Sequence, residues 1–173
     1  MVDDVWRVRR ATAADADGIA AVLERVAAER TSSAIDRAWP PAEQRQYLES
    51  LSPRETFHVA VDAAGTIVGY QSVDRYSTIL PSMAHVAQLG TFVLSEWRGR
   101  GIGQALFAKT RQFAIAVGYH KLVIQVRGSN SGAQGFYRRL GFVECGRLRD
   151  QVIIDGHTDD EVVMEMFLAH PTR

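Results

Sequence analysis

The sequence VAQLGTFVLSEWRGRGIGQALFAKTRQFAIAV, residues 86–117, decides the fold of this chain. Its first part is apolar and indicates a buried strand, which we expect over Met83–Leu94, and Ile102–Val117 carries apolar residues at helical spacing. Between them lies a turn rich in glycine and arginine. A strand that passes directly into a helix leaves unpaired N–H groups and a positive dipole at the helix N-terminus. We therefore expect the turn to bind a phosphate group, most economically a pyrophosphate.

Two common phosphate-binding motifs fail here on spacing. A P-loop requires a lysine and then serine or threonine after its last glycine, whereas Gly103 is followed by glutamine and alanine. A dinucleotide-binding turn requires G-x-G-x-x-G or a final alanine, and neither Gly99 nor Gly101 begins a complete copy. The pattern that remains is R-x-x-G-x-G, which starts at Arg98.

A second motif follows one helix and one strand later. Lys121–Val126 predicts a buried strand, and residues 130–142 read NSGAQGFYRRLGF. Together the two segments resemble the GNAT family of N-acetyltransferases, whose signature Q/R-x-x-G-x-G/A precedes a run N-x-x-A-x-x-F/L-Y-x-x-x-G-F. The positions in register with that run are Asn130, Ala133, Phe136, Tyr137, Gly141 and Phe142.

The resemblance implies a GNAT-like fold of mixed α/β class (an α+β mixed sheet), as a single N-acetyltransferase domain over residues 1–173. It further implies about seven strands that splay between the fourth and fifth, flanked by about four helices. The order of the predicted elements independently favours a mixed sheet, because a helix between the fourth and fifth strands requires a parallel pair with a right-handed crossover.

The resemblance also implies acetyl-coenzyme A as co-substrate, and no metal. The turn would hold the pyrophosphate, and the main chain of Phe92, Val93 and Leu94 would pair with the pantetheine arm. Tyr137 would be the general acid that faces the thioester sulfur, since a tyrosine pKa near ~10 is close to the ~8.5 of a thiol. The residues expected to bind the coenzyme are Phe92, Val93, Leu94, Arg98, Gly99, Arg100, Gly101, Ile102, Gly103, Gln104, Asn130, Ala133, Phe136 and Tyr137.

The general base stays open at this stage. Gln88 occupies roughly the position where some relatives carry glutamate, and an amide cannot accept the proton. His85, Glu96 and a relay of ordered water are the alternatives.

The acceptor of the acetyl group is only weakly constrained by the sequence. Residues 31–53 are expected to form one wall of its site, with Glu29, Arg30, Arg37, Trp39 and Tyr47 as candidates. Arginines 30, 37 and 75 would suit an amine that carries a carboxylate, whereas Asp155, Asp159, Asp160 and Glu161 would attract a cationic amine. We expect a small primary amine or amino acid; a protein N-terminus or lysine, and a coenzyme-binding regulatory module without turnover, are the alternatives.

Composition bears on which partners the protein binds and on the cellular compartment in which it works. Twenty basic and twenty acidic residues balance, which argues against nucleic acid and membrane surfaces as partners. The acidic start Met1-Val-Asp-Asp is unlike a signal peptide, and Cys145 is the single cysteine. These features favour a cytoplasmic protein with a small-molecule partner, with a homodimer as a candidate assembly.

The remaining elements follow from periodicity and turn residues. Strands are expected over Trp6–Arg10, Thr56–Val61 and Thr66–Val73, the last two joined by a turn at Asp62–Gly65. A first helix begins at Thr12 or Asp15, and a second spans Ala42–Leu51. The tail predicts two strands, Phe142–Arg149 and from Val152 to Phe167, around an Asp155-Gly156 turn.

Overall fold

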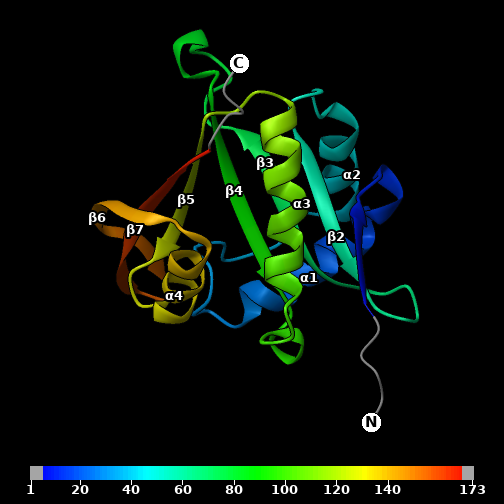
Figure 1. The fold of residues 1–173 in the computed structure, drawn as a ribbon. Helices are drawn as coiled ribbons and strands as arrows, with labels where there is room; N and C mark the ends of the chain where they lie inside the picture. The colour runs from blue at the N-terminus through cyan, green and yellow to red at the C-terminus, as the bar shows by residue number, and fades with distance from the viewer. Residues whose placement is uncertain (1–5, 169–173) are drawn as a thin grey trace.

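The computed structural model describes residues 6–168, and its strands form one mixed sheet (Figure 1). The strand order is β1-β2-β3-β4-β5-β7-β6, and only β4 and β5 pair in parallel within the described residues. This confirms the predicted fold class. The strands are β1 (Arg7–Arg10), β2 (Thr56–Val61), β3 (Ile67–Arg75), β4 (Val86–Val93), β5 (Lys121–Arg127), β6 (Val143–Ile154) and β7 (His157–Phe167).

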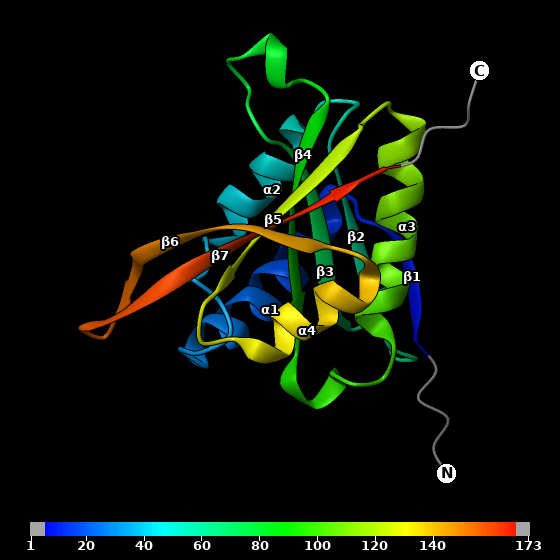
Figure 2. The same ribbon diagram turned by 60° about the vertical axis from the view of Figure 1, so that its left-hand side comes forward.

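Four α-helices cover the sheet: α1 (Ala16–Ala28), α2 (Pro41–Ser50), α3 (Ile102–Ala116) and α4 (Ser131–Leu140). Figure 2 shows α1 and α2 on one side of the sheet and α3 on the other. A 3₁₀ turn precedes α1, and there the N–H of Thr12 donates to the carboxylate of Asp15 over 2.8 Å, which satisfies a donor at the helix start.

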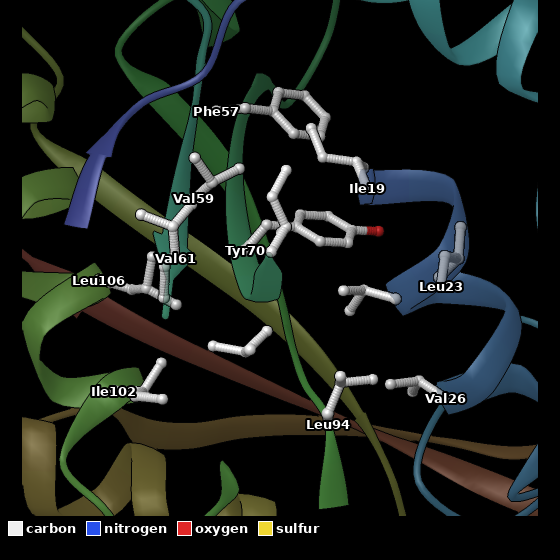
Figure 3. Packing of buried hydrophobic residues seen from close by; sticks show 14 of the residues in the cluster. Ile19, Leu23, Val26, Phe57, Val59, Val61, Tyr70, Leu94, Ile102 and Leu106 are labelled. Atoms are coloured by element: carbon white, nitrogen blue, oxygen red, sulfur yellow. The ribbon is translucent and has the colours of Figure 1, made fainter. Parts of the chain in front are cut away.

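The first of two apolar clusters joins both helical layers through the sheet. In Figure 3, Leu23 of α1 lies on one side of the strands, next to Tyr70. Leu106 of α3 lies on the other side, past Val59. The second cluster lies under α4 and includes Tyr137, Phe142 and the fully buried Met164 of β7. The first cluster packs on β2 and β3 and the second on β5 and β7, so each stabilises the strands on one side of the β4–β5 opening.

The sheet opens between β4 and β5. Their pairing covers only Val86–Gln88 against Lys121–Val123, although both strands continue further. On its other edge β4 stays paired with β3 as far as Val93. The predicted splay is therefore present, and β4 has an open edge from Leu89 to Val93.

Two predicted boundaries were wrong by three residues or more. The central strand begins at Val86 rather than Met83, because Pro81–Met83 forms a 3₁₀ turn. The penultimate strand does not end at Arg149 but runs to Ile154, because bulges accommodate the irregular stretch and Asp150 adopts a positive φ of 48°.

Candidate active site

A cleft of about 1310 Å³ lies at the opening between β4 and β5. Its walls come from the loop after α1, from β3, β4 and β5, from the turn before α3, and from α4. Pockets for one small ligand typically measure ~300–1,000 Å³, so this cleft has room for two substrates. We call the part around the turn, α4 and the open edge of β4 the coenzyme half, and the part around Trp39, Tyr70, Asp74 and Glu161 the acceptor half.

The turn before α3 presents main-chain donors to the cleft. Gly99 and Gly101 have φ values of 75° and 83°, in the left-handed region that favours glycine, and Gly101 is the N-cap of α3. The next three residues, 102–104, line the cleft, and their N–H groups belong to the unpaired first turn of the helix. Such a helix start suits a phosphate, so the arrangement fits the predicted pyrophosphate site.

Gly103 lets two helices approach closely. A Cβ built there would lie 2.9 Å from the Phe136 ring of α4, closer than real contacts allow. The absent side chain therefore lets α4 dock against the start of α3. Both residues line the cleft.

The two arginines of the turn do not both point at the cleft as the sequence suggested. The Arg98 guanidinium donates from Nε to the carbonyl of Val93 over 2.9 Å and forms an ion pair with Glu29 at 2.8 Å. Arg100 lies over the Trp97 ring at 5.0 Å and is not part of the cleft lining. Arg98 thus braces the turn, and the main-chain N–H groups at the start of α3 remain available to a ligand.

The prediction for the main chain of β4 needs a correction at Leu94 and Phe92. The N–H of Leu94 donates to the carbonyl of Val68 over 3.0 Å, so it is engaged with the strand on the other side. Because main-chain groups alternate in direction along a strand, Phe92 also pairs with β3, whereas Thr91 and Val93 face the open edge. Leu94 is buried in the core, while Phe92 and Val93 line the cleft.

Tyr137 reaches the open edge from α4. Its hydroxyl donates to Oγ1 of Thr91 over 2.7 Å, and Nε2 of Gln71 donates to the same oxygen over 2.7 Å. Burial raises the pKa of Tyr137 to about 12, and the hydrogen bond to Thr91 opposes that shift. The tyrosine is therefore protonated at neutral pH. No sequence motif marks Thr91 or Gln71, and neither was predicted as a site residue.

Asn130 ties the coenzyme half to the loop after α1. Its Oδ1 accepts the N–H of Ala133 over 3.0 Å and so caps α4, and its Nδ2 donates to the carbonyl of Ser32 over 2.9 Å. Arg127 makes a similar connection, because its guanidinium donates to the carbonyl of Arg30. The loop thereby becomes a wall of the cleft.

The acceptor half is lined by aromatic rings and two carboxylates. Trp39, Tyr47, Phe57, Tyr70 and Phe92 form a chain of ring contacts with centroids 4.9–5.9 Å apart. Asp74 accepts a hydrogen bond from the Tyr47 hydroxyl, and burial raises the pKa of Asp74. Burial likewise raises the pKa of Glu161, which lies on β7.

Neither side chain proposed as base reaches the cleft. His85 lies beside His120, with ring centroids 6.1 Å apart, and Glu96 is paired with Arg25 at 2.8 Å. Gln88 does line the cleft and donates to Oε1 of Gln125 over 2.9 Å. Of the alternatives, the water relay is left untested.

Two of the three arginines proposed to bind a carboxylate pair with other residues, and none of the three lines the cleft. Arg30 pairs with Asp155 at 3.2 Å and Arg75 with Glu55 at 3.5 Å. Arg37 lines a separate, smaller cavity beside α2 together with Glu43. The carboxylates Asp74 and Glu161 do line the cleft, and Arg127 beside Glu161 is engaged by Asp159.

The rest of the described structure adds little to the ligand set. Among residues 6–168 no cluster of three or more histidine, cysteine, aspartate or glutamate side chains could hold a metal ion. No helix within that range has the length and apolar character needed to cross a membrane.

Comparisons with known proteins give the family and the fold. The sequence model of the acetyltransferase (GNAT) family matches residues 22–142. The L-methionine sulfoximine/L-methionine sulfone acetyltransferase of Pseudomonas paraeruginosa is 29% identical over 96% of both chains. The N-alpha-acetyltransferase RimI of Mycobacterium tuberculosis is 30% identical over 70% of this chain and 72% of its own. The phosphinothricin acetyltransferase Pat of Sinorhizobium meliloti, solved with acetyl-coenzyme A, superposes with a TM-score of 0.87 at 21% identity, over 94% of this chain and 88% of that one.

Proposed function

This chain belongs to the acetyltransferase (GNAT) family and is an acetyl-coenzyme A-dependent N-acetyltransferase, and we propose that its acceptor is a small primary amine such as an amino acid or a close analogue. The observation that carries the proposal is the acceptor half itself. Its wall, residues 31–35 and Trp39, is held to the neighbouring loops by the bonds from Asn130 and Arg127. A bounded cleft of this kind favours a small molecule.

We assign the coenzyme to the other half by the fit of its groups. The N–H groups at the start of α3 would take the pyrophosphate, and the outward main-chain groups of Thr91 and Val93 would take the pantetheine arm. One of these N–H groups would also stabilise the oxyanion of the tetrahedral intermediate. The coenzyme supplies the activated thioester.

Tyr137 is the proposed general acid. With a pKa of about 12 the hydroxyl is protonated at neutral pH and can donate to the sulfur as the carbon–sulfur bond breaks. Because a thiol has a pKa of ~8.5, this transfer is uphill by itself and requires the coupled return of a proton to the tyrosine. The attacking nitrogen, which must lose protons, can return one to the tyrosine. Thr91 holds the hydroxyl at the open edge before the coenzyme binds.

A second candidate acceptor is a protein N-terminus. The similarity to RimI, an N-alpha-acetyltransferase, favours it, although that relative matches a smaller part of the chain than the methionine sulfoximine enzyme does. We further propose that the chain works as one catalytic domain in the cytoplasm. Exposed apolar residues on the β6–β7 hairpin, such as Leu148 and Ile153, support a homodimer, which sedimentation would test.

Thiol release from acetyl-coenzyme A across free amines, amino acids and peptides tests the proposal, with mass detection of the products. We expect turnover with a small amine and about a 100-fold loss of kcat in Tyr137→Phe, with coenzyme binding retained. Turnover of peptides alone would favour the second candidate. Coenzyme binding without turnover of any amine would favour a regulatory module instead.

A further inference from the structure

The β6–β7 hairpin carries four carboxylates close together in the sequence, and three of them have arginine partners. Asp155 pairs with Arg30 at 3.2 Å, Asp159 with Arg127 at 2.8 Å, and Asp160 with Arg147 at 3.1 Å. The fourth, Glu161, accepts its hydrogen bond at Oε2 from the neutral amide of Gln125, over 3.2 Å. Only Glu161 of the four lines the cleft.

Strand alternation fixes the side from which Glu161 reaches the opening. Its neighbours Val162 and Met164 are fully buried in the cluster that contains Tyr137. Because successive side chains point to opposite faces of a strand, Glu161 points to the other face of the sheet. Tyr137 and Glu161 therefore flank the opening from opposite faces.

Main-chain register places Glu161 at the level of the open part of β4. Glu161 pairs with Arg127 of β5, four residues beyond Val123, where pairing with β4 ends. A hydrogen-bonded row crosses the opening on this face, from Gln88 of β4 to Gln125 of β5 and then to Glu161. The row ends in the one group able to accept a proton.

The charged groups around Glu161 are already engaged. Arg127 is its cross-strand neighbour, but the guanidinium of Arg127 donates to Asp159 and to the carbonyl of Arg30. Burial, rather than a charged partner, raises the pKa of Glu161. A half-buried carboxylate without a cationic partner attracts an ammonium group and serves as a base for it.

We propose that Glu161 binds the ammonium group of the acceptor and is the general base of the acetyl transfer. This inference rests on the proposed function. Glu161 takes one proton from R–NH₃⁺ and later releases it to solvent. The neutral nitrogen then forms a bond to the thioester carbon, whose carbonyl electrons move to oxygen. Return of those electrons breaks the carbon–sulfur bond, the thiolate takes the proton of Tyr137, and the nitrogen's second proton restores the tyrosine.

The isosteric variant Glu161→Gln tests this assignment, with Asp160→Asn on the same strand as the matched control. Each protein is assayed with the best acceptor amine and with a fluorinated analogue whose lower pKa makes it neutral at the assay pH. Calorimetry with acetyl-coenzyme A reports whether each variant keeps its coenzyme half.

We expect Glu161→Gln to lose about 100-fold in kcat/KM with the ammonium acceptor and less than about fivefold with the neutral analogue, at unchanged coenzyme affinity. Asp160→Asn should stay within about twofold of the parent. Equal losses with both amines would overturn the role as base, and no loss with either would overturn the assignment altogether. If the parent enzyme acetylates no amine, the proposed function fails, and this inference fails with it.

Discussion

The coenzyme half and the acceptor half of the cleft are built from different kinds of groups. The coenzyme half offers main-chain donors at the start of α3 and along the open edge of β4. The acceptor half offers side chains from several segments far apart in the sequence, including Trp39, Tyr70, Asp74 and Glu161. Main-chain groups can bind one constant ligand with few sequence requirements, whereas side chains must be chosen for each acceptor. The contrast predicts that mutations in the two halves have separable effects.

The largest effect is expected at Gly101, where Gly101→Glu would place a carboxylate beside the pyrophosphate. We expect the affinity for acetyl-coenzyme A to fall more than about 1,000-fold, because like charges repel and the positive φ strains any side chain. Gly65→Glu is the matched control, since Gly65 has a φ of 85° in open space at the β2–β3 turn. Equal affinities of the two variants in calorimetry would contradict the placement of the coenzyme half.

The next effect concerns the sheet that both halves share. Burial, with the positive charges of Arg10 and Lys109, lowers the pKa of His58 from 6.5 to about 4. Above pH 6.5 the imidazole is neutral in the folded and the unfolded chain, and below it the unfolded chain alone binds the proton. The free energy of unfolding should thus fall by about 3 kcal/mol between pH 6.5 and 4.

Urea denaturation at several pH values measures this slope, and His58→Gln should flatten it. A variant with the parent's slope would show that another group controls acid stability. The same measurement shows whether a loss of activity at acid pH comes from unfolding of the protein or from a change in the catalytic step.

Two tryptophans at opposite ends of the cleft give a reciprocal test. Trp39→Leu should raise the acceptor KM about tenfold and leave the affinity for acetyl-coenzyme A unchanged, because its ring contacts Tyr47 in the acceptor half. Trp97→Leu, in the coenzyme half, should show the opposite pattern. Steady-state kinetics with both substrates varied would reveal it; parallel changes in the two variants would mean that the halves are not independent.

The smallest effect is expected where the two halves touch, at the ion pair of Glu29 and Arg98. Glu29→Gln should free the guanidinium for the phosphates and tighten coenzyme binding by no more than about threefold at low salt, because partly exposed pairs are worth little. Weaker binding would mean instead that Glu29 is needed to hold the turn in place.

Much of the coenzyme half could be predicted from the sequence. A turn that leads a strand into a helix has the same local geometry wherever it occurs, so Gly101 and the N-terminus of α3 followed from the pattern itself. What the sequence could not give is how the turn is held: Arg98 pairs with the distant Glu29, and the N–H of Leu94 pairs with Val68 of the neighbouring strand, and no local pattern reveals either partner.

The sequence by itself determined the order of the elements, the parallel β4–β5 pair and the glycine-rich turn that begins α3, because periodicity, glycine positions and helix starts are local properties. Only the tertiary structure decided which acidic residue faces the cleft. The sequence does not distinguish the four acidic residues of the tail, Asp155, Asp159, Asp160 and Glu161. In the fold, arginines pair with the three aspartates, and one of these arginines, Arg30, comes from the loop after α1. Which carboxylates are neutralised depends on residues that only the fold brings together. The side chains of the acceptor half therefore could not be assigned from the sequence.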